Sequence, residues 1–386
     1  MTKIGIIGAG AMGTGIAQVA ATAGHEVYLY DANADALQRA ITTLRNTLDM
    51  LAQKGKMTES AADTIFRRFH FVEKKLDSLR DCGLIIEAII ENLDVKKGLF
   101  DQLQEVIAPD CMLATNTSSL SVTSIASACR EPQRVLGIHF FNPAPLMKLV
   151  EIIPAIQTNG KIVEQAQAII QSWNKTTVIA KDTPGFIVNR VARPFYGEAL
   201  RIYEEGIADI ATIDWAMKEV GGFKMGPFEL MDFIGHDVNY TVTETIFQAF
   251  FYDPRYKPSF SQKRLVEAGY LGKKSGRGFY DYNENVIKPR PNEDAVLCET
   301  IFERIGVMLI NEAADAVFWK VATKEDIDLA MTLGVNYPKG LLKWADEWGI
   351  DTIVKTLDDL YHVYHEDRYR CSPLLRKMAK VKETFY

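Results

Sequence analysis

The stretch "IGIIGAGAMG" at residues 4–13 decides the fold of this chain. Its first half is apolar, rich in isoleucine and closed by a glycine, which is typical of a fully buried strand. Its second half carries Gly8, Gly10 and Gly13 in the spacing G-x-G-x-x-G, and a helical pattern follows. A second apolar strand then ends at Asp31. A glycine loop between strand and helix, with an acid closing the next strand, predicts the dinucleotide-binding unit of a doubly wound, Rossmann-type α/β sheet.

The glycine loop also predicts the cofactor. Backbone N–H groups and the dipole at a helix N-terminus favour a pyrophosphate there, while Asp31 is suited to accept hydrogen bonds from the adenine-ribose hydroxyls. The charge of Asp31 repels a 2′-phosphate, and neither Ala32 nor Asn33 is an arginine that could hold one, so we expect NAD rather than NADP. The alternative is an ordinary glycine-rich turn with a capping aspartate. The expected loop contacts are Gly8, Gly10, Ala11, Met12 and Gly13.

Further apolar runs extend the doubly wound pattern, and polar side chains follow several of them. In open α/β sheets, ligands bind beyond the carboxyl ends of the strands. Glu91, Ser118 and His139 stand at or just past such ends, so we expect them to meet where a nicotinamide lies. The segments expected to contain these strands are 79–92, 112–121, 134–141, 149–153 and 176–185.

His139 and Glu151 lie on two successive expected strands. An imidazole titrates near neutrality, so His139 is suited to take a proton from a hydroxyl while a hydride leaves the same carbon. Glu151 is suited to hold the other ring nitrogen and to stabilise the imidazolium that forms. A satisfied structural histidine and a solvated glutamate are the alternatives, and the dinucleotide-binding context favours the catalytic pair.

Three longer stretches resemble the signatures of L-3-hydroxyacyl-CoA dehydrogenases. They are "NTSSLSVTSIAS" (116–127), "GIHFFNPAPLMKLVEII" (137–153) and "KDTPGFIVNR" (181–190). The resemblance runs to about residue 282, where it ends in "LGKKSGRGFYDY". It implies His139 as the general base, Glu151 as its partner, and Ser118 and Asn189 as hydrogen-bond donors to substrate oxygens.

The physical readings of these donors leave alternatives. An Asn189 amide can donate to a developing oxyanion, but a polar residue on a helix face is the plainer reading. Ser118 belongs to a hydroxyl cluster that is also suited to cap a helix at 122–128, and Ser121 is the expected cap. The resemblance implies NAD contacts by Asp31, Glu91, Lys96, Asn116, Ser118, Asn142 and Lys274, and CoA contacts by Lys54 and Thr47 in the less well matched helical excursion after Asp31. No metal is expected.

The remaining chain contains an internal repeat. Shifted by 114 positions, Ile187 meets Ile301, Arg190 meets Arg304, and "IDWAM" meets "IDLAM" without a gap. A constant offset over this length indicates a duplicated helical unit, with coincidence between amphipathic helices as the alternative. The two copies are joined by "NENVIKPRPNED" (283–294), which contains two prolines.

The second copy lacks the residues that the resemblance assigns to the active site. Asn189 maps onto Glu303 and Pro227 onto Leu341, and nothing near the C-terminus is expected to match "GKKSGRGFY". We therefore expect the second copy to be a structural partner of the first. Short members of the family that the chain resembles are typically dimers joined through their helical C-terminal domains, so we expect the second copy to occupy that face through a quasi-two-fold contact. The predicted fold class is a Rossmann-type doubly wound sheet domain (1–182) followed by two tandem all-α domains, at 183–288 and, non-catalytic, at 289–386. The chain is expected to be a monomer or a homodimer.

Composition narrows the classes of protein. The 386 residues carry a net charge of −6, which argues against a nucleic-acid partner. No apolar run reaches the roughly 18 residues that a membrane span needs, so no membrane contact is expected. Five cysteines without a paired pattern favour a reducing, cytoplasmic location.

Together these features predict NAD-dependent oxidation of an L-3-hydroxyacyl-CoA to the 3-oxoacyl-CoA, or the reverse reduction. A short-chain or dicarboxylic acyl group fits, in fatty-acid or aromatic-acid degradation. One alternative is a related dehydrogenase of a free hydroxy or sugar acid, as in the lens-crystallin-like relatives. Another is a non-catalytic NAD-binding protein, which has no need of a base such as His139.

Overall fold

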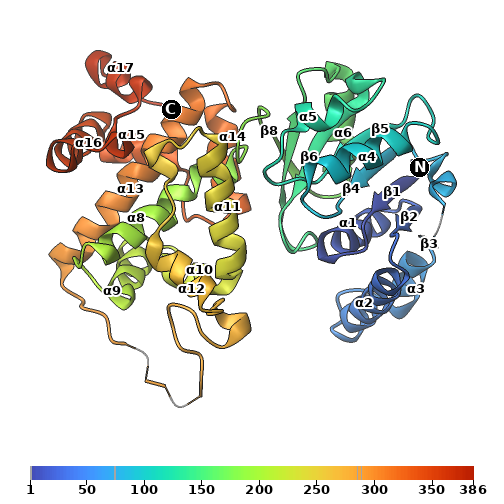
Figure 1. Cartoon of the computed structure of the whole chain (residues 1–386), viewed down its shortest axis with the longest axis horizontal. Coiled ribbons are helices and arrows are strands. Elements are labelled where there is room, and N and C mark those ends of the chain that lie inside the picture. The colour runs from blue at the N-terminus through green and yellow to red at the C-terminus, as the bar shows by residue number, and fades with distance from the viewer. Residues whose placement is uncertain (1, 74, 285, 288) are drawn as a thin grey trace. The chain divides into compact units, whose positions relative to one another are not determined.

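A computed structural model describes residues 2–73, 75–284, 286–287 and 289–386. Contacts along the chain separate two compact units, residues 1–183 and residues 184–386, and each is described by itself (Figure 1). The described residues of the expected linker at 283–294 form neither helix nor strand, and residues 285 and 288 of that linker lie outside the described residues.

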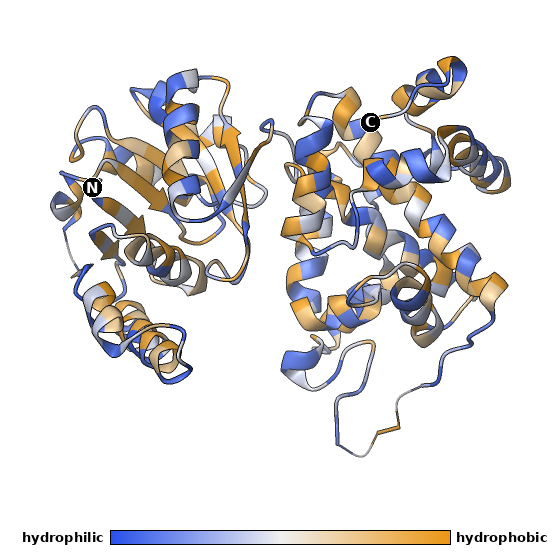
Figure 2. Ribbon diagram, turned by 180° about the vertical axis from the view of Figure 1, so that it is seen from behind, coloured by the Kyte–Doolittle hydropathy of each residue, from blue (hydrophilic) through white to orange (hydrophobic). Residues whose placement is uncertain are grey.

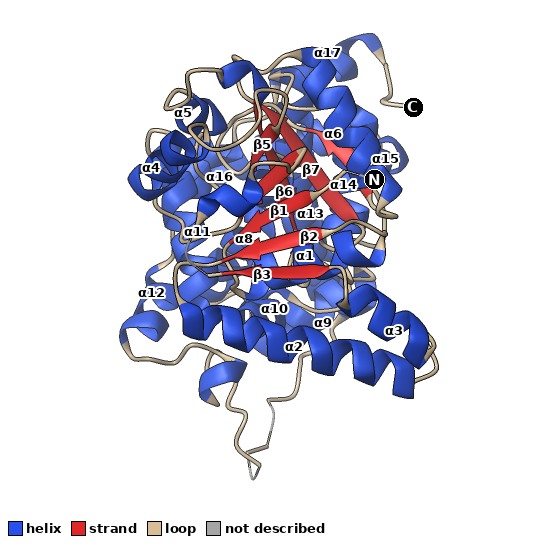
Figure 3. Ribbon diagram, turned by 90° about the vertical axis from the view of Figure 1, so that its right-hand side faces the viewer, coloured by secondary structure: helices blue, strands red, loops and turns tan. Residues whose placement is uncertain are grey.

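The first unit is built on one eight-stranded sheet with the order β3-β2-β1-β4-β5-β6-β7-β8 (Figure 3). Neighbouring strands are parallel except β6 and β7, which are antiparallel. This order winds outward in both directions from β1, so the predicted doubly wound fold class is confirmed. The strands are β1 (Ile4–Ile7), β2 (Val27–Tyr30), β3 (Phe69–Val72), β4 (Leu84–Glu87), β5 (Met112–Thr115), β6 (Val135–Phe140), β7 (Leu149–Pro154) and β8 (Thr176–Ile179).

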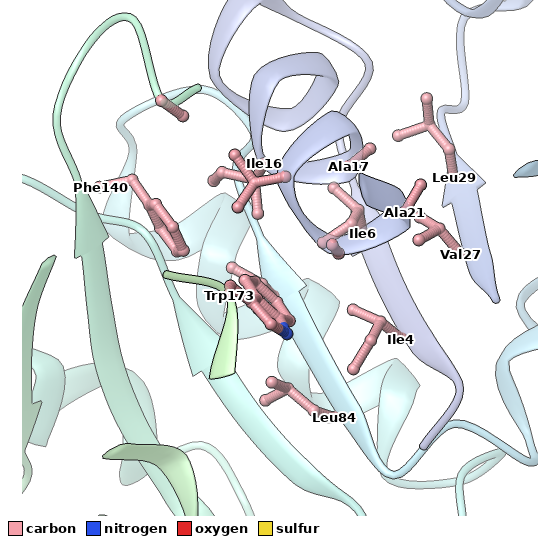
Figure 4. Packing of buried hydrophobic residues seen from close by; sticks show 14 of the residues in the cluster. Ile4, Ile6, Ile16, Ala17, Ala21, Val27, Leu29, Leu84, Phe140 and Trp173 are labelled. Carbon is pink, nitrogen blue, oxygen red and sulfur yellow. The ribbon is translucent and has the colours of Figure 1, made fainter. Parts of the chain in front are cut away.

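Alternation along the strands sorts the side chains onto the two faces of the sheet. On one face Ile4 and Ile6 pack against Ile16 and Ala17 of a helix, with Trp173 beside them (Figure 4). The helices that contribute to this core are α1 (Ala11–Thr22), α2 (Ala34–Gln53), α3 (Glu59–Phe66) and α6 (Gly160–Ser172). On the other face lie α4 (Leu93–Leu103) and α5 (Val122–Ala126), which pack against each other. Ser121 caps α5 as expected, since its hydroxyl accepts from the N–H of Ser124.

The second unit is all helical and repeats one helix order. The bounds of α10 (Pro227–Ile234) recur after 114 residues in α15 (Leu341–Trp348), and those of α8 (Arg193–Glu204) recur in the C-terminal half of α13 (Ala295–Phe318). Mixed polar and apolar faces run along these helices (Figure 2), and among the described residues no helix is long and apolar enough to cross a membrane. The remaining helices are α7 (Val188–Val191), α9 (Ile210–Trp215), α11 (His236–Ala249), α12 (Phe260–Glu267), α14 (Lys324–Gly334), α16 (Ile350–Tyr364) and α17 (Pro373–Val381).

The repeat also preserves carboxylates that accept hydrogen bonds from backbone N–H groups. Asp232 accepts from the N–H groups of residues 279–280, both at 2.9 Å, and Asp346 accepts from those of residues 385–386 at 2.7 and 2.8 Å. The expectation that nothing near the C-terminus matches "GKKSGRGFY" was therefore wrong for its last two residues. The second copy keeps a Phe-Tyr pair whose backbone N–H groups donate to the carboxylate. It lacks the glycine-rich loop that precedes this pair in the first copy.

Candidate active site

The glycine loop has the close packing that its spacing predicts. Gly8 adopts a φ of +105°, and a Cβ on Gly13 would lie 1.8 Å from the carbonyl oxygen of Gly8, so α1 can approach β1 only at a glycine. A Cβ on Gly10 would meet nothing within 4 Å. Gly10 therefore borders open space at the N-terminus of α1, where an anion is favoured.

A cavity of about 420 Å³ continues from this loop and is lined by Gly8, Asp31, Ile89 and Val95, among others. Asp31 accepts hydrogen bonds from the N–H of Ala9 at 2.7 Å and from the N–H of Asn33 at 2.8 Å. An acid at one end and apolar walls beside it fit an adenosine group that is held by its ribose hydroxyls and covered on its faces. The residues present thus fit NAD.

A buried ion pair lies under the carboxyl edge of β4. The Nζ of Lys96 is 2.5 Å from Glu87 Oε1, and both side chains are at most 1% exposed. Glu87 also accepts from the Thr115 hydroxyl at 2.7 Å and from the N–H of Ile89 at 2.7 Å. Glu87 was not among the predicted site residues. A signal for it exists, because a glutamate inside the apolar run "LIIEAII" must find a partner if the run is a buried strand.

Glu91 organises the loop that follows β5. It accepts from the Thr117 hydroxyl at 2.6 Å and from the N–H of Ser118 at 2.9 Å, and Lys96 lies 3.3 Å from its other oxygen. Burial alone raises the pKa of Glu91, but the Lys96 ammonium and the hydrogen bonds from Thr117 and Ser118 outweigh it and hold the pKa below its usual value. An ionised Glu91 therefore fixes the loop that carries Ser118.

The predicted histidine and glutamate meet in the antiparallel pair β6–β7. His139 and Glu151 are directly opposite each other in register, so their side chains share one face of the sheet. His139 Nδ1 lies 2.7 Å from Glu151 Oε2. His139 is 5% exposed and Glu151 is fully buried. Beside a carboxylate, Nδ1 is the protonated ring nitrogen, which leaves Nε2 as the acceptor.

The remaining predicted residues fall in different places. The Asn116 side-chain oxygen accepts from the N–H of Phe140 at 2.8 Å, which ties the loop after β5 to the strand that carries His139. Asn142 is exposed on the loop after β6, and Asn189 is half-buried in α7. In the second unit, Lys274 pairs with Asp237 at 2.6 Å. The contacts of Asn116, Asn142, Lys274 and Lys96 with NAD stay predictions, as does the contact of Asn189 with substrate.

A larger cavity, of about 700 Å³, lies in the first unit beside α1 and the end of α2. Thr47 and Lys56 line it together with Met50 and Trp173, whereas Lys54 stands at the C-terminal end of α2. The lining combines apolar side chains with hydroxyl and ammonium groups, which suits a long ligand with an apolar arm and an anionic end.

Fold and site thus define an NAD-binding α/β domain with a buried histidine–carboxylate pair, followed by a helical unit. The model of the NAD binding domain of 3-hydroxyacyl-CoA dehydrogenase matches residues 3–183. The model of the C-terminal domain of 3-hydroxyacyl-CoA dehydrogenase matches twice, at 185–282 and 301–384. The chain belongs to the 3-hydroxyacyl-CoA dehydrogenase family, a family of NAD-dependent enzymes, and the predicted resemblance is confirmed.

Individual relatives agree with this family. The chain is 39% identical to 3-hydroxyadipyl-CoA dehydrogenase of Escherichia coli, over 99% of this chain and 98% of the relative. It is 43% identical to mitochondrial hydroxyacyl-coenzyme A dehydrogenase of Rattus norvegicus, over 72% of this chain and 90% of the relative. The crystal structure of 3-hydroxybutyryl-CoA dehydrogenase from Escherichia coli superposes with a TM-score of 0.92 at 38% identity, covering 98% of both chains. That of (S)-3-hydroxybutyryl-CoA dehydrogenase from Ralstonia eutropha gives 0.71 at 37% identity, covering 74% of this chain and all of its own.

Proposed function

We propose that this protein oxidises short-chain or dicarboxylic L-3-hydroxyacyl-CoA at the 3-hydroxyl, or reduces the 3-oxo product, with His139 as the general base. The observation that carries the proposal is the buried contact of 2.7 Å between His139 and Glu151. That contact stands on the same sheet as the glycine loop, whose packing fits NAD. A binding protein without turnover has no need of this pair.

The residues divide the work of the reaction. Glu151 holds the proton on Nδ1 and stabilises the imidazolium, so Nε2 of His139 can take the proton of the 3-hydroxyl. Ser118, whose loop is fixed by Glu91, and Asn189 donate hydrogen bonds to substrate oxygens as the carbonyl forms. Bound NAD supplies the acceptor for the hydride that leaves the same carbon.

The larger cavity supports a CoA thioester rather than a free hydroxy acid. Its volume and apolar walls suit the pantetheine arm, and Lys56 supplies a charge for phosphate. We propose Thr47 and Lys56 as CoA contacts. Lys54, which the resemblance also implies as a CoA contact, stands at the C-terminal end of α2 beside them. Since two of the relatives named above are called 3-hydroxyadipyl-CoA dehydrogenase and 3-hydroxybutyryl-CoA dehydrogenase, both short-chain and dicarboxylic substrates are proposed.

The second helical copy is proposed to be non-catalytic, and the proposed domains span 1–182, 183–288 and 289–386. Glu303 replaces Asn189, and its carboxylate accepts a hydrogen bond from Thr356 at 2.9 Å, so it is engaged in a local contact of its own copy. All five cysteines are buried and unpaired, which supports the proposed location in the reducing cytoplasm.

A substrate panel tests the proposal. Acetoacetyl-CoA, 3-oxoadipyl-CoA and free acetoacetate are each offered with NADH, and loss of the reduced-nicotinamide absorbance is followed. We expect turnover of the thioesters and none of the free acid. Equal turnover of the free acid would refute the CoA assignment, and no turnover of any thioester would refute the activity.

A further inference from the structure

Two buried ion pairs cross between the copies of the helical repeat. Arg190 of the first copy bonds Glu312 of the second through Nε at 2.6 Å, and Arg304 of the second bonds Glu198 of the first through Nε at 2.7 Å. The two arginines are 114 positions apart, and so are the two glutamates. The contact is therefore quasi-two-fold within unit 184–386, because each copy presents the same arginine and the same glutamate to the other.

The environments of the two glutamates match closely. Glu312 is fully buried and accepts from the Tyr256 hydroxyl at 2.5 Å, while Glu198 is 2% exposed and accepts from the Tyr369 hydroxyl at 2.5 Å. Glu312 has one additional buried partner, the Arg255 guanidinium at 3.1 Å. Burial alone raises the pKa of Glu312, but the two arginines and Tyr256 outweigh it, so its pKa lies below the usual value and the group is ionised.

The arginines of the two ion pairs lie in different kinds of helix. Arg190 directly follows Asn189 in α7, a helix of four residues without a side-chain N-cap. Phe186 before it adopts a φ of +48°. Only Ala192 separates α7 from α8, so α7 is the first part of an interrupted helix, and it packs against α13 and α14 of the second copy. Arg304 instead lies within the 24-residue α13, where the counterpart of Asn189 is Glu303.

We propose that Glu312, in the second copy, is a positioning residue for the dehydrogenation. It holds Arg190, which sets the place of α7 and so the direction of the Asn189 amide. The second copy is thus part of the apparatus that aligns the substrate oxygen, besides covering the face of the first copy. This inference rests on the proposed role of Asn189.

The quasi-symmetry supplies a matched control. Glu312→Gln and Glu198→Gln each remove one buried charge while keeping the side-chain shape and an acceptor for the tyrosine. We expect the larger loss of thermal stability in Glu312→Gln, because Arg304 keeps its contacts with Glu205 at 2.8 and 2.9 Å when Glu198 is replaced. Glu312→Gln is expected to lower kcat for 3-hydroxybutyryl-CoA by roughly 10²-fold, the scale of a misplaced aligning group, with the Kd of NADH unchanged. Glu198→Gln is expected to keep kcat near the wild-type value. Equal effects of the two variants on kcat would overturn the proposal.

A double-mutant cycle separates this inference from the proposed function. If Glu312 acts through Asn189, Glu312→Gln has little further effect on kcat in an Asn189→Ala background. An Asn189→Ala variant with normal turnover would instead show that the proposed role of Asn189 is wrong. If Glu312→Gln does not fold, Glu312→Asp keeps the charge and shifts Arg190. It should then lower kcat without changing the Kd of NADH, and normal kcat in that variant would count against the positioning role.

Discussion

Cofactor choice depends on one carboxylate, and its removal has separable consequences. Asp31 lines the cavity beside the glycine loop and also accepts from the buried N–H of Ala9 at 2.7 Å. In Asp31→Asn the amide oxygen can still accept from Ala9, but the negative charge is gone. In Asp31→Ala both the charge and the acceptor are lost.

The magnitudes follow from these contacts. A hydrogen bond to a charged acceptor contributes about 1.5–3 kcal/mol, so losing the ribose contact should raise the Kd of NADH roughly 10–150-fold. In Asp31→Ala the unpaired N–H of Ala9 costs about 1–3 kcal/mol more, and this should also lower the thermal stability. Repulsion between a carboxylate and a 2′-phosphate is worth up to about 4 kcal/mol at close range, so the Kd of NADPH should fall in both variants.

Fluorescence titration of NADH and NADPH against wild type and both variants measures these changes. The Kd of NADPH divided by the Kd of NADH should fall by at least about 10²-fold in Asp31→Asn. The thermal stability of this variant should be closer to wild type than that of Asp31→Ala. An unchanged NADH Kd, or wild-type protein that binds NADPH as well as NADH, would show that Asp31 does not select the cofactor.

Three further predictions concern the repeat, the larger cavity and Glu91. Truncation after residue 293 removes the second copy and exposes its partner face, so light scattering should show a new dimer or aggregate and the melting temperature should fall; a monomeric, equally stable product would contradict the repeat arrangement. Lys56→Ala should raise KM for acetoacetyl-CoA several-fold, as expected for one lost charge-assisted contact, and more than Lys54→Ala does; the opposite order would favour Lys54 as the phosphate contact. The lowered pKa of Glu91 adds stability that is present above its usual value of 4.5 and is lost as pH falls through the folded-state value. Urea unfolding should therefore show a shallower loss of stability below about pH 4.5 in Glu91→Gln than in wild type, and identical slopes would mean that Glu91 is not held ionised by the fold.

Much of the fold could be predicted because its signals are local. The glycine spacing works through steric contacts within ten residues, such as Gly13 against Gly8. The pairing of His139 with Glu151 needs only two strands joined by a short loop. The repeat was visible because one offset of 114 persists, and the helix bounds recur at the same offset.

Features that depend on distant partners were not predicted. The edge strand β3 (Phe69–Val72) was not predicted, because a four-residue strand in which only Phe69 is buried leaves little pattern. The ion pair of Lys96 with Glu87 was not predicted either, because it depends on how the chain folds between β4 and α4, and the contact of Lys96 with NAD stays a prediction. The match of residues 385–386 to residues 279–280 is too short to read in sequence and became clear only from the shared carboxylate contacts.

The central claim is that His139 takes the proton of the 3-hydroxyl with the support of Glu151, and His139→Gln tests it most directly. On one preparation, the Kd of NADH is measured by titration and kcat for 3-hydroxybutyryl-CoA oxidation is measured by the appearance of NADH. We expect an unchanged Kd and a kcat lower by roughly 10²–10⁴-fold, the usual contribution of a general base. Turnover close to the wild-type rate in this variant would contradict the account.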